Sequence, residues 1–376
     1  MQLCEYFGRC GGCTTQHVPY ELQLSNKLKF VEGLFKKAEI ELPHIEVMSG
    51  QQFHYRNRMD FVFSKAGPGL RKRGKFDRIV PIKACKIAHE RINILLNEVW
   101  EWFENSKEKL EPFLIKAAQG TLKYAVIRVT LTGDSSISFI LNEESSKLNT
   151  HVEQIKQFSL QTSAENVIVG YVPRRSDVSF SKECFAVKGG LILTEELLGR
   201  KIRFHSQAFF QTNCFLARKL VEKVRTLFSK HSTEEGILID LYGGAGSFGI
   251  TSGDLFSKTI IIDNSEENIR CAEENLKINN IQGEAISADA SFLRKLKLAA
   301  PVFMIVDPPR SGINPKVIKY ILGLLPKVII YVSCNPKEFV KDLHYFLEHY
   351  TLESLTLLDM FPNTNHIELV AELKKR

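Results

Sequence analysis

In the second half of the chain, a glycine-rich loop and three carboxylates each follow an apolar run that is typical of a buried strand. The loop reads DLYGGAGSFG over residues 240–249, and the later runs end at Asp263, Asp289 and Asp307. Glycines let a backbone approach a ligand closely, and an acidic residue about 20 positions further on can accept hydrogen bonds from ribose hydroxyls. The pattern therefore predicts a site for a nucleotide-like cofactor, and both NAD and S-adenosylmethionine satisfy it.

A thiol follows the fifth apolar run, at Cys334 in the sequence SCNP. Buried cysteines are more often small hydrophobic residues than nucleophiles. Here the apolar run stops at Val332 and a polar turn follows, so we expect the thiol to face the cofactor at the same edge of the sheet as the other strand ends. Glu368, in the short alternating run HIELV, completes a candidate catalytic site, and a surface carboxylate on an edge strand is the alternative reading of it.

Four cysteines near the start of the chain form a second group of residues that could bind a metal or react. Cys4, Cys10 and Cys13 lie close together, and Cys85 follows much later. Structural zinc sites typically use two close pairs of cysteines. Three clustered thiols and one remote cysteine instead favour an iron–sulfur cluster with a structural role, and zinc or free thiols are the alternatives.

The elements that position the first group alternate between strand and helix. Apolar runs typical of buried strands occupy residues 237–243, 302–307 and 327–333, and a helical pattern covers 265–279. Such alternation predicts a parallel sheet with crossover helices. We therefore expect a Rossmann-like α/β domain over residues 199–376, with the candidate residues at the carboxyl ends of its strands.

The first half of the chain has a different pattern. Short runs rich in β-branched and aromatic residues, such as LKYAVIRVTLTG and NVIVGYV, are broken by Gly, Asn, Asp and Pro. Helical patterns lie at residues 21–37 and 90–105. We expect an α+β domain with an antiparallel β core over residues 1–198, which carries the four cysteines.

The composition limits the class of protein. The chain has 376 residues, 44% hydrophobic and 25% charged, which is typical of a soluble globular protein of about two domains. Its net charge of +7 is compatible with a polyanionic partner. The sequence has neither a membrane-spanning run nor a signal-peptide pattern, and eight cysteines without such a signal indicate a reducing compartment. We expect a cytoplasmic protein, with a monomer as the default.

In their order along the chain, the motifs resemble those of one family. GTLKYAVIR, HSQAFFQTN, DLYGGAG, DPPRSG, SCNPKEFVKDL and DMFPNTNHIELV follow one another. They are similar to the motifs of RNA uracil-C5 methyltransferases, and the similarity covers nearly the whole chain. The resemblance favours S-adenosylmethionine over NAD and implies a class I methyltransferase fold for the second domain.

The resemblance also implies roles for the site residues. Carbon 5 of uracil is a poor nucleophile, but thiolate addition at carbon 6 gives an enolate whose carbon 5 can attack the sulfonium methyl group. By similarity, Cys334 is this nucleophile, and Glu368 is the base that removes the proton from carbon 5. The predicted cofactor-binding residues are Gln211, Tyr242, Gly244, Asp263, Asp289 and Asp307.

Two departures from the family pattern fall in the cofactor loop. The family usually has Cys or Ser where this chain has Gly243, and usually Glu where it has Asp263. Neither departure removes a required chemical group. Phe209 and Phe210 offer rings that can stack on the target base, and aromatic core packing is an equal reading.

For the cysteines, the resemblance implies a [4Fe-4S] cluster on Cys4, Cys10, Cys13 and Cys85, as in the family's ribosomal-RNA members. The same resemblance implies that residues 16–42 pack on the catalytic domain. We expect no RNA-binding barrel before the cluster. A cluster without a barrel predicts uracil 747 of 23S ribosomal RNA as the substrate, presented in a single strand or flipped out. Uracil 1939 of 23S RNA and uracil 54 of tRNA are the alternatives.

Two further classes of function compete with this one. Amino-group methyltransferases also carry DPP motifs, but they need no thiol, so SCNP and the C-terminal carboxylate would be coincidences. A non-catalytic RNA-binding protein is disfavoured because the donor-site and nucleophile motifs are all present. The basic stretch at residues 70–78, together with Arg56 and Arg58, is as compatible with phosphate contacts as with a solvated hairpin. Neither DNA nor a membrane is expected as a partner.

Overall fold

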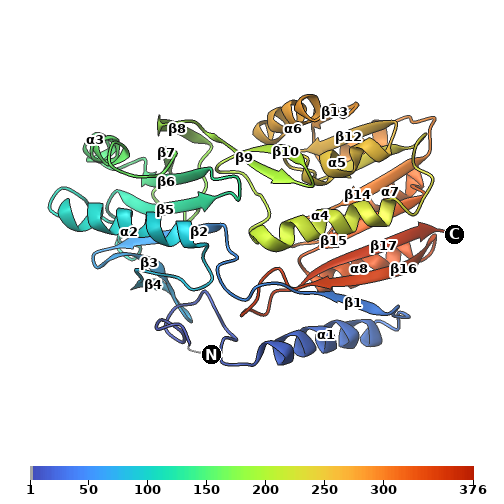
Figure 1. Ribbon diagram of the computed structural model, residues 1–376, viewed down its shortest axis with the longest axis horizontal. Coiled ribbons are helices and arrows are strands. Elements are labelled where there is room, and N and C mark those ends of the chain that lie inside the picture. The colour runs from blue at the N-terminus through green and yellow to red at the C-terminus, as the bar shows by residue number, and fades with distance from the viewer. Residues whose placement is uncertain (1–2) are drawn as a thin grey trace. The chain divides into compact units, whose positions relative to one another are not determined.

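The structure is a computed structural model that describes residues 3–376, and it divides into two compact units. Unit 1 contains residues up to Val18, Gln51–Thr194 and His205–Ala208. Unit 2 contains Pro19–Gly50, Glu195–Phe204 and Phe209–Arg376. Each unit is built on its own large sheet (Figure 1).

Unit 1 is a seven-stranded sheet with two helices. Its elements are β2 (Arg58–Ser64), β3 (Gly67–Lys72), β4 (Lys75–Pro81), α2 (Glu90–Asn105), β5 (Leu122–Val129), β6 (Ser135–Asn142), α3 (Leu148–Ser159), β7 (Asn166–Val172) and β8 (Glu183–Lys188). The strand order is β4-β3-β2-β5-β6-β7-β8. All neighbours are antiparallel except β6 and β7, which are parallel because the chain crosses between them through α3. The expected antiparallel core is therefore a mixed sheet.

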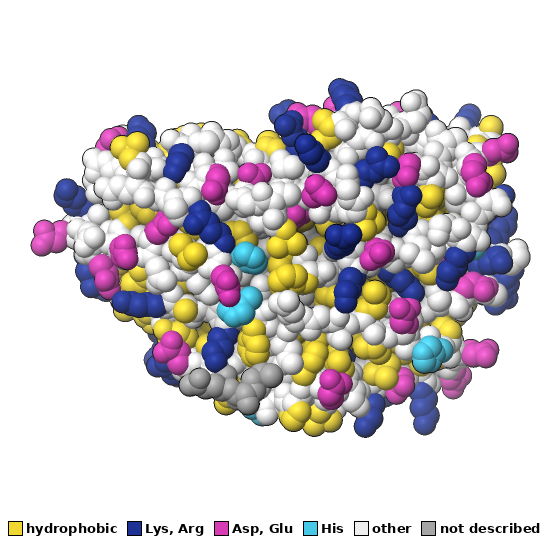
Figure 2. Space-filling view, in the orientation of Figure 1, with side chains coloured by type: hydrophobic (Ala, Val, Ile, Leu, Met, Phe, Trp, Pro, Cys, Tyr) yellow, Lys and Arg dark blue, Asp and Glu magenta, His cyan; other side chains and the backbone are white. Residues whose placement is uncertain are grey.

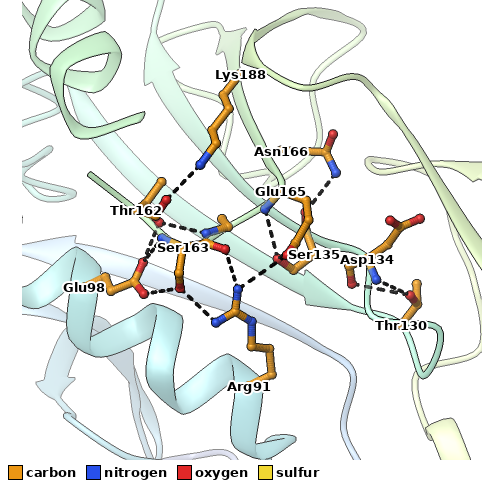
Figure 3. A network of polar contacts seen from close by, with 11 residues as sticks. Arg91, Glu98, Thr130, Asp134, Ser135, Thr162, Ser163, Glu165, Asn166 and Lys188 are labelled. Carbon is orange, nitrogen blue, oxygen red and sulfur yellow. Dashed lines mark hydrogen bonds and ion pairs between the residues drawn. The ribbon is translucent and has the colours of Figure 1, made fainter. Parts of the chain in front are cut away.

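A polar network fixes the segment after α3 onto α2 (Figure 3). Glu98 of α2 accepts hydrogen bonds from the Thr162 hydroxyl at 2.5 Å and from the Ser163 amide at 3.0 Å. Arg91, two turns earlier on the same helix, donates to the Ser163 hydroxyl at 2.8 Å and to its carbonyl at 2.5 Å. Partly buried polar groups need such partners, so this network holds the entry to β7 in one place.

The four cysteines predicted to bind iron lie together in unit 1, but they do not form a metal site. Cys4, Cys10, Cys13 and Cys85 line one cavity of about 20 Å³, which has room for about one water molecule. Among residues 3–376, no group of three or more His, Cys, Asp or Glu side chains is placed to hold a metal ion. The prediction of an N-terminal domain carrying a [4Fe-4S] cluster is therefore wrong. Burial raises the pKa of the Cys13 thiol to about 12 and that of Cys85 to about 11, which favours protonated thiols.

Unit 2 is an eight-stranded sheet covered by helices. Its elements before the glycine-rich loop are α1 (Tyr20–Lys37), β1 (Ile45–Met48), α4 (Cys214–Phe228) and β11 (Ile237–Leu241). Its elements after that loop are α5 (Ser247–Ser252), η1 (Gly253–Leu255), β12 (Lys258–Asp263), α6 (Glu266–Ile278), β13 (Gly283–Ser287), η2 (Ala290–Lys295), β14 (Val302–Val306), α7 (Pro315–Leu324), β15 (Val328–Ser333), α8 (Pro336–Phe346), β16 (Tyr350–Leu358) and β17 (Glu368–Lys375). β9 (Ile192–Leu197) and β10 (Arg200–His205) pair separately as a two-stranded sheet.

The strand order of unit 2 is β1-β16-β17-β15-β14-β11-β12-β13. The five strands from β15 to β13 in this order are parallel, and β17 is antiparallel to both of its neighbours. The chain moves from β11 to β12 and β13 on one side, and then to β14 and β15 on the other. Open α/β sheets bind their ligands at such a reversal, beyond the carboxyl ends of the strands.

Helix α1 and strand β1 extend this sheet from a distant part of the sequence. Val31 and Phe35 of α1 are fully buried in the same hydrophobic core as the apolar residues of the central strands. β1 pairs in parallel with β16, so that Ile45 lies opposite Leu355. Among the described residues, no helix is long and apolar enough to cross a membrane.

Candidate active site

The glycine-rich loop leaves β11 in a sharply turned conformation. Tyr242, Gly244 and Gly246 have φ angles of 62°, 56° and 87°. A Cβ at Gly246 would lie 2.7 Å from a side-chain atom of Ile261, so this position requires glycine for space as well as for backbone angle. At Gly243, a Cβ would lie 2.8 Å from the Ile261 side chain. Glycine at this position therefore lets the loop lie directly on β12.

Asp263, the last residue of β12, holds this loop in place. Its Oδ2 accepts a hydrogen bond from the Gly244 amide at 3.0 Å. Its Oδ1 accepts from the Ser265 amide at 2.9 Å and from Nδ2 of Asn268 at 3.1 Å. A carboxylate has about four acceptor positions. The three hydrogen bonds therefore leave room for one further donor, such as a hydroxyl group of a ligand.

A cavity of about 350 Å³ opens beside Asp263, in the size range of small-molecule sites. It lies at the carboxyl ends of β11, β12 and β13 and is closed by the start of α7. Its lining residues are Leu241, Tyr242, Ile262, Asp263, Asn264, Ala288, Asp289, Ala290, Ser291, Asn314, Lys316, Val317 and Tyr320. Three of the six residues predicted to bind the cofactor are thus in this wall, whereas Gln211, Gly244 and Asp307 are not.

The contribution of α7 to this cavity was not predicted from the sequence. Asn314 caps the helix by accepting a hydrogen bond from the Lys316 amide at 2.9 Å, and Pro315 is the first residue of the helix. An Asn-Pro pair shortly after a strand end is a recognisable helix start. That signal could have placed the first turn of α7 at the same edge of the sheet as the glycine-rich loop.

The buried carboxyl group of Asp240 and the partly buried one of Asp307 lie close to the loop. Asp240 of β11 accepts a hydrogen bond from the Gly249 amide at 2.7 Å through Oδ2, and its Oδ1 has no hydrogen-bond partner among the described residues. Burial raises the pKa of Asp240 to about 7. Burial, together with the charge of Asp240, raises the pKa of Asp307 to about 7 as well. Near neutral pH these groups are therefore partly protonated in the absence of a ligand.

We expect Asp240→Asn to stabilise the protein at pH 8 by about 1–3 kcal/mol in the free energy of unfolding. The pKa of Asp240 is higher in the folded state than its unfolded value of about 3.9. Its contribution to stability is therefore fully present below pH 4 and is lost as the pH rises through about 7. The amide of the variant does not titrate, so the difference between the two proteins should grow from pH 4 to pH 8. Urea unfolding at both pH values measures it, and a constant difference would contradict the prediction.

Cys334 and Glu368 lie beside each other at the ends of adjacent strands. The antiparallel pairing of β15 with β17 places Ser333 opposite Leu369, and Cys334 and Glu368 are the next residues along the two chain segments. Glu368 is 4% exposed. Burial, and then the charge of Asp307, raises its pKa well above the usual range, while Arg310 opposes the shift. Burial and the charges of Glu368 and Asp307 likewise raise the pKa of Cys334 to about 11, again against Arg310.

Hydrogen bonds between neighbouring loops fix the position of Arg310. Asn335, directly after the thiol, donates from Nδ2 to the Arg310 carbonyl at 2.8 Å. Asp342 of α8 accepts from the Ile313 amide at 2.8 Å and from the Tyr331 hydroxyl at 2.6 Å. The DPPRSG loop is thus tied both to the SCNP turn and to α8. The sequence pattern singled out neither Asp342 nor Tyr331, because both are spaced as ordinary members of a helix and a strand.

The two adjacent phenylalanines after β10 have different environments. Phe210 is 5% exposed and its ring stacks on that of Phe204, with centroids 4.1 Å apart. Phe209 is 68% exposed. Phe210 therefore packs in the core, and of the two rings only that of Phe209 is exposed to the solvent, where it could stack on a base. Gln211, the next residue, is half-buried.

Comparison with known proteins gives a consistent result. A family model described as tRNA (uracil-5-)-methyltransferase matches residues 19–376. A tRNA (uracil(54)-C(5))-methyltransferase of Pyrococcus horikoshii is 35% identical over 372 residues, covering 98% of this chain and 85% of that protein. An RNA methyltransferase of Caldanaerobacter subterraneus is also 35% identical, covering 99% of this chain and 84% of the relative.

A solved structure extends the similarity to the fold. The tRNA (uracil-54, C5)-methyltransferase of Pyrococcus abyssi, crystallised in complex with S-adenosyl-L-homocysteine, superposes with a TM-score of 0.78 at 30% sequence identity. The match covers 97% of this chain and 86% of that one.

Proposed function

The chain belongs to the tRNA (uracil-5-)-methyltransferase family and is an RNA uracil-C5 methyltransferase that uses S-adenosylmethionine, and we propose that its substrate is uracil 54 of tRNA. The observation that carries the substrate is the 35% identity, over 98% of this chain, to an enzyme named for that uracil. Uracil 747 of 23S RNA was predicted from an iron–sulfur cluster without an RNA-binding barrel, and the described residues do not form the metal site on which that prediction depended.

A direct comparison of substrates tests this proposal. The protein would be incubated with S-adenosylmethionine carrying a tritiated methyl group and either an unmodified tRNA transcript or a 23S RNA fragment containing uracil 747. We expect label in the tRNA, and none in the same tRNA with cytosine at position 54. Label in the ribosomal fragment alone would overturn the choice of substrate while leaving the chemistry intact.

For the cofactor, we propose that S-adenosylmethionine occupies the 350 Å³ cavity, with its ribose hydroxyls at Asp263 and its adenine beside Asp289. The remaining acceptor position of Asp263 suits a ribose hydroxyl. The positively charged sulfonium, bound near Asp240 and Asp307, would lower the pKa of both carboxyls and favour their ionised forms.

We expect Asp263→Ala to weaken the binding of S-adenosylhomocysteine about 10- to 100-fold, as measured by calorimetry. The substitution removes the acceptor for the ribose and also the hydrogen bond that holds the Gly244 amide. Glu284→Gln is the matched control, because Glu284 lies on the neighbouring strand β13 and pairs with Lys258 instead. Equal affinities in the Asp263 and Glu284 variants would contradict the assignment.

For the reaction, we propose that Cys334 adds as a thiolate to carbon 6 of the uracil, and that carbon 5 then takes the methyl group from the sulfonium. Glu368 removes the proton from carbon 5, the carbon–sulfur bond breaks, and the thiolate leaves. S-adenosylhomocysteine, 5-methyluridine and one proton are the products. Burial raises the pKa of Cys334, and the charge of Arg310 opposes that rise, so Arg310 favours the thiolate that the first step requires.

For RNA binding, two of the arginines singled out in the sequence already have partners within unit 1. Arg71 is committed within unit 1, where it donates to the Phe76 carbonyl at 2.6 Å and to Asp177 at 2.6 Å. Arg58 pairs with Asp60 at 3.0 Å. We propose that phosphate contacts come from Arg73 at the turn between β3 and β4. On the face shown in Figure 2, basic and acidic side chains are interspersed, so we infer that shape and base contacts contribute alongside charge.

A further inference from the structure

The loop of residues 359–367 joins β16 to β17, and Glu368 is the first residue after it. Leu358 pairs with Glu368 across the two strands, so the loop closes directly on the proposed base. Asp359, Met360 and Asn363 are at most 1% exposed. Buried loops are uncommon, because every polar group of the backbone must find a partner.

Helix α1 supplies several of these partners. Lys27 donates from Nζ to Asp359 Oδ1 at 2.5 Å and to the Phe361 carbonyl at 3.2 Å. Gln23 accepts from the Asn363 amide at 3.0 Å and donates to the Asn363 side-chain oxygen at 3.3 Å. Gln23 and Lys27 are four residues apart, so both side chains lie on one face of the helix. They are 3% and 5% exposed.

A further hydrogen bond reaches the loop from the start of α4. Asn213 donates from Nδ2 to the Met360 carbonyl at 3.0 Å, while its Oδ1 caps α4. The segment before the base is thus held at its beginning by Lys27 and Asn213 and at its centre by Gln23. Asn363 has a φ angle of 65°, a conformation that asparagine adopts more readily than most residues.

These polar contacts are not what docks α1 on the sheet. Val31 and Phe35, one and two turns further along the helix, are fully buried among apolar residues and provide that docking. A buried ion pair such as Lys27–Asp359 is also a weak source of stability, because both charges lose their hydration. The ion pair has a clearer geometric consequence, because it holds the loop of residues 359–367 in one position.

We propose that Lys27 and Gln23 are positioning residues for Glu368, which act by holding the loop of residues 359–367. This inference rests on the proposed function, because it takes Glu368 as the base. Cys334 follows β15, outside this loop, and no residue of the loop lines the cofactor cavity. Loosening the loop therefore slows removal of the carbon-5 proton more than thiolate addition or methyl transfer. The methylated RNA then stays bonded to Cys334.

The test measures this covalent intermediate. Lys27→Met and Gln23→Leu would be mixed with a tRNA transcript and S-adenosylmethionine, quenched in detergent, and resolved on a denaturing gel. We expect 5-methyluridine release to fall about 10- to 100-fold, the cost of a displacement of about 1 Å at a reacting group. The fraction of protein bonded to RNA at steady state should rise, and the affinity for S-adenosylhomocysteine should be unchanged.

His231→Asn is the matched control. His231 contacts Glu372 at 2.7 Å, so this variant also removes one partner of a buried carboxylate on β17, four residues beyond Glu368. It touches no residue of the loop. We expect any loss of activity in it to follow the loss of folded protein, without an increase in the covalent intermediate.

Glu368→Gln in the same assay distinguishes the role of Glu368 as the base from the positioning role of Lys27 and Gln23. If Glu368→Gln accumulates the intermediate but Lys27→Met and Gln23→Leu do not, the positioning role is overturned and the base assignment stands. If Glu368→Gln accumulates none, the base assignment fails and the inference fails with it. Should Lys27→Met not fold, Lys27→Met/Asp359→Leu removes both charges and carries the test together with Gln23→Leu.

Discussion

Cys334→Ser is expected to lower the rate of RNA methylation by about 10⁴-fold or more. A serine hydroxyl loses its proton far less readily than a thiol, so the nucleophile that activates carbon 5 would be missing. The change in size is small and Cys334 is only half-buried, so the fold should be retained. Single-turnover transfer of a tritiated methyl group to the RNA measures the effect.

Two further measurements make this result specific to the covalent mechanism. RNA containing 5-fluorouridine has no proton to lose at carbon 5, so the wild-type protein should stay bonded to it on a denaturing gel and Cys334→Ser should not. Binding of S-adenosylhomocysteine should be equal in the two proteins, because Cys334 does not line the cofactor cavity. Methylation by the variant within tenfold of the wild-type rate would show that transfer needs no thiol.

The strand ends of unit 2 were readable from the sequence for a physical reason. Alternating strands and helices force a parallel sheet, and a parallel sheet puts all its carboxyl ends at one edge. Tyr242, Asp263 and Asp289 therefore line one cavity, although they are far apart in the chain. Glu368 begins the antiparallel strand β17, so its place beside the end of β15 does not follow from this argument. For these three residues, strand type and direction were sufficient, whereas Gln211, Gly244 and Asp307 were also predicted and do not line the cavity.

Other features depend on packing that no local pattern encodes. The spacing of Cys4, Cys10 and Cys13 brings the thiols together, but it does not determine the volume that they enclose. Phe209 and Phe210 are adjacent in an irregular segment, where neither period of regular structure indicates which ring faces the core. The partners of the loop before Glu368 come from α1, at the opposite end of the sequence, and a polar side chain on an amphipathic helix normally indicates a solvent-exposed face.

Glu368→Gln is expected to slow the release of 5-methyluridine by about 10²- to 10⁴-fold and to trap the RNA on Cys334. An amide cannot take the carbon-5 proton, whereas thiolate addition and methyl transfer do not need this group. Glu372→Gln, on the same strand and paired with His231, is the control and should accumulate no covalent complex. A Glu368→Gln protein that turns over normally, or that forms no complex, would contradict the role of base.

The raised pKa of Glu368 also predicts how elimination depends on pH and how stable Glu368→Gln is relative to the wild type. Burial and Asp307 raise the pKa, so the carboxylate is a stronger base than usual but becomes protonated as the pH falls. In the wild-type protein, elimination from the covalent complex should therefore slow at lower pH, while the slow elimination in Glu368→Gln should be insensitive to pH over that range. The stabilising contribution of a carboxyl with a raised folded-state pKa is lost as the pH rises through that pKa. Above it, the uncharged Gln avoids burying a charge, so the variant should unfold at a urea concentration at least as high as the wild type. A variant that is inactive yet no less stable would mean that Glu368 is buried for its chemistry and not for the fold.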